Sequence, residues 1–141
     1  MIDSFISKLA RWSAGEKDIR AVALVGSQAR GTAAFDSDID LVIICPDPSR
    51  YLESKDWLSH FGRIKSAERE DWGLVRSWRV FYWDGNEVEF GLTTEQWCSE
   101  SEFNSGTGRV ISDGAKIVFD PHSLLADLIA AIDRWQSAQM D

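Results

Sequence analysis

The sequence predicts an α/β (α+β) fold in which helices flank a small mixed β-sheet. Amphipathic helical patterns alternate along the chain with short apolar runs of strand length. Two of these runs flank Asp84-Gly85-Asn86, a tight-turn sequence that indicates an antiparallel hairpin and argues against an all-parallel sheet. The 141 residues suffice for one buried core, so we expect a single domain over residues 1–141.

The first half of the chain is expected to contain three helices and two strands. Apolar residues at helical spacing predict the first helix, which Gly15 ends. Runs rich in Val, Leu and Ile predict two buried strands, and a Gly26-Ser27 turn connects the first of them to a short helix. The expected elements are a helix over residues 3–14, a strand over 19–25, a short helix near 27–33, a strand over 38–45 and a helix over 50–60.

The second half is expected to begin with the hairpin and to end with a long helix. Thr93-Thr94-Glu95 is typical of a helix start, and residues 101–108, rich in Ser and Gly, indicate a mobile loop. Asp120-Pro121 places a proline at the start of the last helix. The expected elements are strands over 75–83 and 87–92, a short helix through about residue 100, a strand over 115–119 and a helix over about 121–138.

The charge balance and hydropathy limit the possible partners. A formal net charge of −8 argues against nucleic-acid binding, which normally needs a basic surface, and it suits a cationic partner or simple solubility. No stretch approaches the roughly 18 apolar residues of a membrane span, so no membrane association is expected. The N-terminus lacks the basic start and apolar block of a signal peptide, and a cytoplasmic location is expected.

The Gly26-Ser27 turn lies between an apolar strand and a helix start. Backbone N–H groups at a helix N-terminus favour phosphate oxygens, and glycine allows close approach of the backbone. The Ser27 hydroxyl adds a further donor. Considered by itself, the turn fits a simple strand-to-helix connection equally well.

Asp38 and Asp40 form a carboxylate pair at the start of the second strand. Side chains at positions i and i+2 of a strand share a face, so these carboxylates lie side by side while Ile39, Leu41 and Ile43 face a core. Adjacent carboxylates repel unless they are solvated, protonated or bound to a cation. Two aspartates on one face are an oxygen-rich ligand set of the kind that Mg²⁺ prefers. With a Gly-Ser turn ten residues upstream, we favour a magnesium–triphosphate site over two merely exposed polar residues.

Gly26-Ser27, ten residues and then Asp38-Ile39-Asp40, with Ala-Arg-Gly between them, resembles the polymerase-beta-type nucleotidyltransferase superfamily. The nearest resemblance is to minimal nucleotidyltransferases and small antibiotic-modifying adenylyltransferases. Residues 88–92 look like the strand that carries the family's third acidic residue, and residues 114–121 look like the strand-to-helix passage that follows. The resemblance implies a polymerase-beta-like nucleotidyltransferase fold.

The resemblance further implies an Mg²⁺-dependent enzyme that moves a nucleoside monophosphate, AMP from ATP, onto a hydroxyl group. Asp38, Asp40 and Glu89 would be the catalytic residues and the metal ligands, and the third carboxylate would also act as the base. Glu89 matches the family position better than Glu87, which shares its strand face but lies nearer the hairpin turn. A glutamate where the family has an aspartate leaves the identity of the base open.

Gly26, Ser27 and Arg30 are the expected nucleotide-binding residues. The resemblance places the β- and γ-phosphates on the Gly-Ser turn. Arg30 follows on the short helix, where it would contact phosphate or pair with a nearby carboxylate. Further basic candidates for the triphosphate are Lys65, Arg76 and Arg79.

The acceptor is either a small molecule, such as a cationic antibiotic of the aminoglycoside or lincosamide kind, or a protein. The alternative function is that of an antitoxin-like minimal nucleotidyltransferase that binds or adenylylates a helical toxin partner. A homodimer that completes the acceptor pocket, and a domain that binds nucleotide without turnover, stay open at this point. Trp83 and Trp97 are candidates for stacking on a nucleobase or an acceptor.

Overall fold

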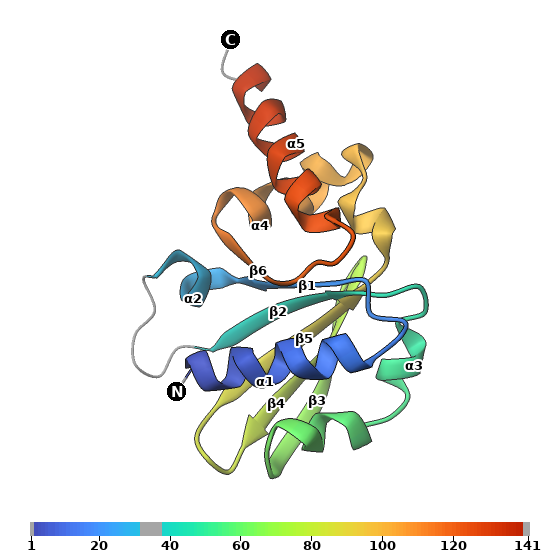
Figure 1. The fold of residues 1–141 in the computed structure, drawn as a ribbon, viewed down its shortest axis with the longest axis vertical. Coiled ribbons are helices and arrows are strands. Elements are labelled where there is room, and N and C mark those ends of the chain that lie inside the picture. Colours follow the sequence, from blue (N-terminus) through green and yellow to red (C-terminus); the bar gives the residue numbers. More distant parts are fainter. Residues whose placement is uncertain (1, 32–37, 140–141) are drawn as a thin grey trace.

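The computed structural model describes residues 2–31 and 38–139 and confirms the predicted fold class. A six-stranded sheet has the order β3-β4-β5-β2-β1-β6, with helices on both faces (Figure 1). Neighbouring strands are antiparallel except β2 and β5, which are parallel. The strands are β1 (Ala21–Val25), β2 (Ile39–Ile44), β3 (Ile64–Trp72), β4 (Val75–Tyr82), β5 (Glu87–Thr93) and β6 (Ala115–Phe119).

The helices differ from the predicted ones mainly at their ends. The expected helix over 50–60 is two shorter elements, because the Ser54 hydroxyl accepts a hydrogen bond from the Asp56 N–H and interrupts the helical pattern. The expected loop over 101–108 is a succession of short helical turns. The helices are α1 (Ile2–Gly15), α2 (Gly26–Arg30), α3 (Ser49–Leu52), η1 (Asp56–Phe61), η2 (Glu95–Cys98), η3 (Glu100–Glu102), η4 (Phe103–Thr107), α4 (Gly108–Ser112) and α5 (Leu124–Gln139).

Two helix ends have clear local causes. Helix α2 ends at Arg30 because Gly31 takes a left-handed conformation with φ +73°, and the rest of the predicted 27–33 helix lies outside the described residues. Helix α5 begins later than the predicted residue 121, since the Asp120 carboxylate accepts hydrogen bonds from the N–H groups of Leu125 and Ala126. Asp120 thus caps the helix from outside its first turn.

Strand β3 was absent from the prediction. It lies at one edge of the sheet, and none of its residues is buried, so its sequence lacks the apolar alternation of a half-buried strand. The two-residue turn Gly73-Leu74 joins it to β4, with Gly73 at φ +83°. That glycine was the available signal for a second hairpin.

The sheet has a hydrophobic core on each face. On one face α1 contributes Phe5 and Leu9 to a cluster that includes Leu41 and Phe90. On the other face α5 contributes Leu128 and Ile132 to a cluster with β1 and β2. Because both faces are covered, β1 and β2 are continuous apolar runs, and the strand ends that carry the carboxylates are held in a fixed frame.

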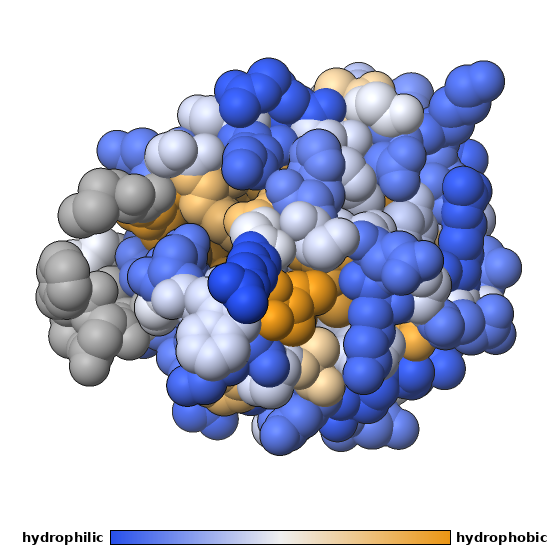
Figure 2. Space-filling view, turned by 90° about the horizontal axis from the view of Figure 1, so that it is seen from below, coloured by the Kyte–Doolittle hydropathy of each residue, from blue (hydrophilic) through white to orange (hydrophobic). Residues whose placement is uncertain are grey.

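The molecular surface is rich in polar and charged side chains (Figure 2), as expected for a sequence in which 27% of the residues are charged. The face in Figure 2 is predominantly hydrophilic, with apolar side chains gathered in small areas between charged and polar ones. Within the described residues, no helix combines the length and the apolar character that a membrane crossing requires.

Gly91 lies in the middle of β5, where the neighbouring residues leave little room for a side chain. A Cβ atom there would lie 2.8 Å from the Leu41 carbonyl oxygen and 2.8 Å from Val75 Cγ1. We therefore expect G91A to lower the free energy of unfolding by about 1–3 kcal/mol, measured by urea denaturation.

G15A is the matched control, because a Cβ at Gly15 meets no atom within 4 Å. It should leave the stability unchanged or raise it by up to about 1 kcal/mol. Equal stability of G91A and G15A would contradict the packing seen at Gly91.

Candidate active site

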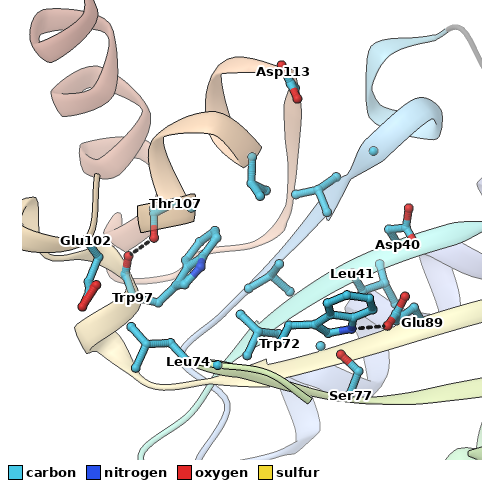
Figure 3. A pocket seen from close by; sticks show the side chains of 18 of the residues that line it. Asp40, Leu41, Trp72, Leu74, Ser77, Glu89, Trp97, Glu102, Thr107 and Asp113 are labelled. Atoms are coloured by element: carbon cyan, nitrogen blue, oxygen red, sulfur yellow. Dashed lines mark hydrogen bonds between the residues drawn. The ribbon is translucent and has the colours of Figure 1, made fainter. Parts of the chain in front are cut away.

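A cavity of about 670 Å³ opens between the sheet and the helical turns that precede α4. Its floor is formed by strand residues, and Trp72 and Trp97 extend into it from different elements (Figure 3). Asp40 and Glu89 lie together at one end of the view, away from Trp97. Much of the lining is apolar, while its acidic side chains are Asp40, Glu89, Glu102 and Asp113.

The structure places the Gly26-Ser27 turn next to the Asp40 carboxylate. The β1–β2 register pairs Val25 with Asp40, so the turn that follows β1 lies beside this carboxylate. Gly26 has φ +74°, and a Cβ there would lie 2.5 Å from Asp40 Oδ2. Position 26 therefore requires glycine both for its conformation and for the room that Asp40 occupies.

Asp40 is half-buried and lies near a second negative charge. Burial raises the pKa of its carboxyl, and the charge of Asp38 raises this pKa further. Arg79 and Arg30 act in the opposite direction. A cation bound here would remove the repulsion between the two aspartates.

Glu89 lies beside Asp40 through the parallel pairing of β2 and β5. Its side chain is 14% exposed, and both oxygens accept hydrogen bonds: Oε1 from Arg79 Nη2 at 2.8 Å and Oε2 from Trp72 Nε1 at 2.8 Å. Burial raises the pKa of Glu89 to about 7, and the hydrogen bond that its protonated form donates to Glu70 adds to the increase.

Arg79 is the centre of the charged network. Besides Glu89, its guanidinium binds Asp38 Oδ2 through Nη1 at 3.1 Å and Glu70 Oε1 through Nε at 3.1 Å. Nη1 also binds Glu87, the other candidate for the third carboxylate. These hydrogen bonds, that to Glu70 first, raise the pKa of Arg79 above its ordinary value, so the guanidinium is a permanent cation.

Of the remaining predicted residues, Ser27 and Arg30 belong to helix α2, whereas Lys65 and Arg76 lie on strands β3 and β4. Ser27 is the second residue of α2, and Arg30 lines the cavity close enough to lower the pKa of Asp40. Lys65 instead lies over the ring of Trp83 at 5.2 Å, outside the cavity lining. Arg76 is exposed on the sheet face opposite Arg79, since positions 76 and 79 alternate along β4.

Sequence reasoning missed Glu70 and Trp72, which belong to the overlooked strand β3. It also gave no role to Glu102, Thr107 or Asp113, which line the cavity from helical turns that were expected to be a loop or were not assigned. A charged edge strand ending in Trp-Gly was the only signal for the first pair.

The residues present fit a divalent cation at Asp38 and Asp40. Within residues 2–31 and 38–139, no group of three or more His, Cys, Asp or Glu side chains is arranged to hold a metal. Two adjacent carboxylates nevertheless suit Mg²⁺, which commonly takes one or two carboxylates and completes its shell with water and substrate phosphates. Glu89 as a metal ligand stays a prediction, because both of its oxygens are engaged.

The sheet, the Gly-Ser turn and the carboxylates of β2 and β5 are arranged as in the fold of polymerase-beta-type nucleotidyltransferases, which the chain resembles. The family described as "Streptomycin adenylyltransferase" matches residues 2–135, and the chain belongs to this family. Comparison with curated proteins gave no match.

Two solved structures share the fold. An aminoglycoside 6-adenyltransferase from Bacillus subtilis is 17% identical with a TM-score of 0.55, over 72% of this chain and 37% of that enzyme. A chain from a structure described as a toxin-antitoxin with AMP-PNP is 15% identical with a TM-score of 0.50, over 99% of this chain and 91% of that chain. The chain therefore spans just over a third of the aminoglycoside enzyme's length.

The raised pKa of Glu89 predicts a pH-dependent stability. The folded protein holds a proton on Glu89 up to about pH 7, whereas the unfolded chain releases it near pH 4.5. This residue's contribution to stability should therefore fall as the pH rises through that window, by on the order of 2–3 kcal/mol. Urea denaturation of wild type and E89Q at pH 5 and pH 8 measures it.

E89Q has no titrating group at this position and should lose less stability than wild type between the two pH values. E95Q, at an exposed site, is the control and should follow wild type. Parallel pH dependence of wild type and E89Q would show that the Glu89 pKa is not raised.

Proposed function

We propose that the chain is an Mg²⁺-dependent adenylyltransferase that moves AMP from ATP onto an acceptor hydroxyl group. The observation that carries this proposal is the position of the Asp40 carboxylate. It lies against the backbone of the Gly26 turn on one side and beside Glu89, across the β2–β5 pair, on the other. The turn proposed to bind phosphate, the carboxylate proposed to bind the metal and the carboxylate proposed as the base are thereby adjacent.

In this proposal each residue of the site has its own role in binding the metal or the triphosphate. Asp38 and Asp40 hold the metal–triphosphate, while Gly26 and Ser27 bind the β- and γ-phosphates and Arg30 contributes positive charge at the cavity. A bound Mg²⁺ offsets the negative charge that develops on the α-phosphate and on the departing pyrophosphate. ATP is the co-substrate that the family name supports.

The transfer itself is a displacement at the α-phosphorus. The acceptor hydroxyl oxygen forms a bond to this phosphorus, and the bond to the bridging oxygen breaks as pyrophosphate leaves with its electron pair. The hydroxyl proton passes to the Glu89 carboxylate. A base with a pKa of about 7 is well matched to this task, and the carboxylate keeps lone pairs beyond those used by Arg79 and Trp72.

A cationic small molecule bearing hydroxyl groups suits the cavity as acceptor. The apolar walls, with Trp72 and Trp97, can contact sugar or aliphatic rings, and Glu102 and Asp113 add negative charge to the lining of the cavity (Figure 3). The family name and the aminoglycoside enzyme of the same fold support a cationic antibiotic.

The second candidate function is modification or binding of a helical toxin protein. It is favoured by the solved toxin-antitoxin chain, which matches nearly the whole of this chain. An acceptor screen with labelled ATP separates the candidates: label on an aminoglycoside or lincosamide supports the first, and label on a co-expressed helical protein supports the second.

The metal–nucleotide role of the aspartates has a direct test. D38N/D40N should weaken Mg²⁺-dependent ATP binding by at least about 100-fold, or about 2.7 kcal/mol, because it removes both carboxylates. Isothermal titration calorimetry with and without Mg²⁺ measures the effect, and circular dichroism verifies the fold.

D127N/D133N is the matched control, since it removes two exposed carboxylates from α5. It should bind the nucleotide as wild type does. Wild-type affinity in D38N/D40N, or binding by wild type without any divalent cation, would refute the proposed site.

A further inference from the structure

Most ion pairs among the described residues involve the Arg79 side chain. Of the six ion pairs found among the described residues, four involve this side chain. The partners come from three other strands or their ends: Asp38 before β2, Glu87 and Glu89 on β5, and Glu70 on β3. The side chain is 22% exposed, so the pairs are partly shielded from water.

The Arg79 guanidinium bridges two carboxylates of the site, as a bound metal cation would. Nη1 binds Asp38 Oδ2 at 3.1 Å while Nη2 binds Glu89 Oε1 at 2.8 Å, so one guanidinium joins the first and the third carboxylate of the site. In enzymes with two catalytic metals, divalent cations about 3.5–4 Å apart are held by shared carboxylates. A second metal between Asp38 and Glu89 would have to share the oxygens to which Arg79 donates hydrogen bonds and would lie next to its positive charge.

We propose that Arg79 takes the place of a second divalent cation, so that the site works with one Mg²⁺, held by Asp38 and Asp40. The inference rests on the proposed function, because it presumes that these two aspartates hold the metal–nucleotide.

The charge balance supports this role. Asp38, Asp40, Glu70, Glu87 and Glu89 gather five carboxylates, and Arg79 pairs directly with four of them. Asp40 is the one for which no Arg79 ion pair is found, and it is also the one that lies against the Gly26 turn.

A guanidinium also suits the position chemically. It stays charged at any working pH and presents five donors in a fixed plane, whereas a lysine ammonium is a single point charge. A second metal would have to displace Arg79 from its four partners or bind next to a fixed positive charge. Either alternative weakens the binding of a second metal ion. Asp40 and the Asp38 oxygen that Arg79 does not contact then hold the first ion.

The experiment counts Mn²⁺ ions in the nucleotide complex. Purified protein is saturated with α,β-methylene-ATP, which cannot donate AMP, and titrated with Mn²⁺ under electron paramagnetic resonance. We expect one bound Mn²⁺ per wild-type chain, with the spectrum of an isolated ion. R79Q should bind a second Mn²⁺ at least tenfold more tightly than wild type does and show the spectral broadening of two neighbouring ions.

R76Q is the matched control, because it removes the same charge from the opposite face of the same strand. It should bind one ion. R79K keeps the positive charge and should also bind one ion, which separates the effect of the charge from any damage to the fold.

Two neighbouring Mn²⁺ ions in the wild-type complex would overturn the inference, whether or not R79Q folds. A folded R79Q that still binds a single ion would overturn it as well. Failure of the proposed function has a different signature, since the wild-type protein would then bind no nucleotide in the presence of Mn²⁺, and no ions would be counted.

Discussion

The repulsion among carboxylates on one sheet face is the constraint on which the arrangement of the site depends. Strands β2, β3 and β5 each bring acidic side chains to the same region, and these partly buried carboxylates would repel one another if they were left unpaired. Arg79 makes this region stable because its guanidinium spans four of these carboxylates. The same contacts hold Glu89 in place beside Asp40, so the stability of the sheet and the geometry of the site have one origin.

The rest of the sheet supplies the rigidity that this network needs. With α1 packed on one face and α5 on the other, β1 and β2 are buried on both sides and cannot shift in register without exposing apolar residues. The register is what pairs Val25 with Asp40 and Asp40 with Glu89. Asp40 and Glu89 therefore lie near the beginnings of fixed strands, and the helical turns before α4 line the cavity.

The sequence allowed prediction of the features that depend on local pattern. The Asp-Gly-Asn turn identified the hairpin of β4 and β5. Period-two alternation led to the prediction that Asp38 and Asp40 form a pair. It did not reveal β3, because an exposed edge strand has no apolar face to bury and its residues follow no amphipathic period. Nor could it select Arg79 over Lys65 or Arg76, since that choice depends on pairings between strands distant in the sequence.

This difference explains why the proposed donor side of the site was recognisable from the sequence and the proposed acceptor side was not. The turn and the two aspartates occupy one contiguous stretch, where spacing reflects geometry directly. The cavity is assembled from the β3–β4 hairpin and the turns around residues 102–113, whose side chains meet only after folding. Trp72 belongs to both sides: its ring lines the cavity, and its indole N–H binds the carboxylate that would take the acceptor's proton. The tip of the β3–β4 hairpin therefore links the aromatic lining of the cavity to the position of the Glu89 carboxylate.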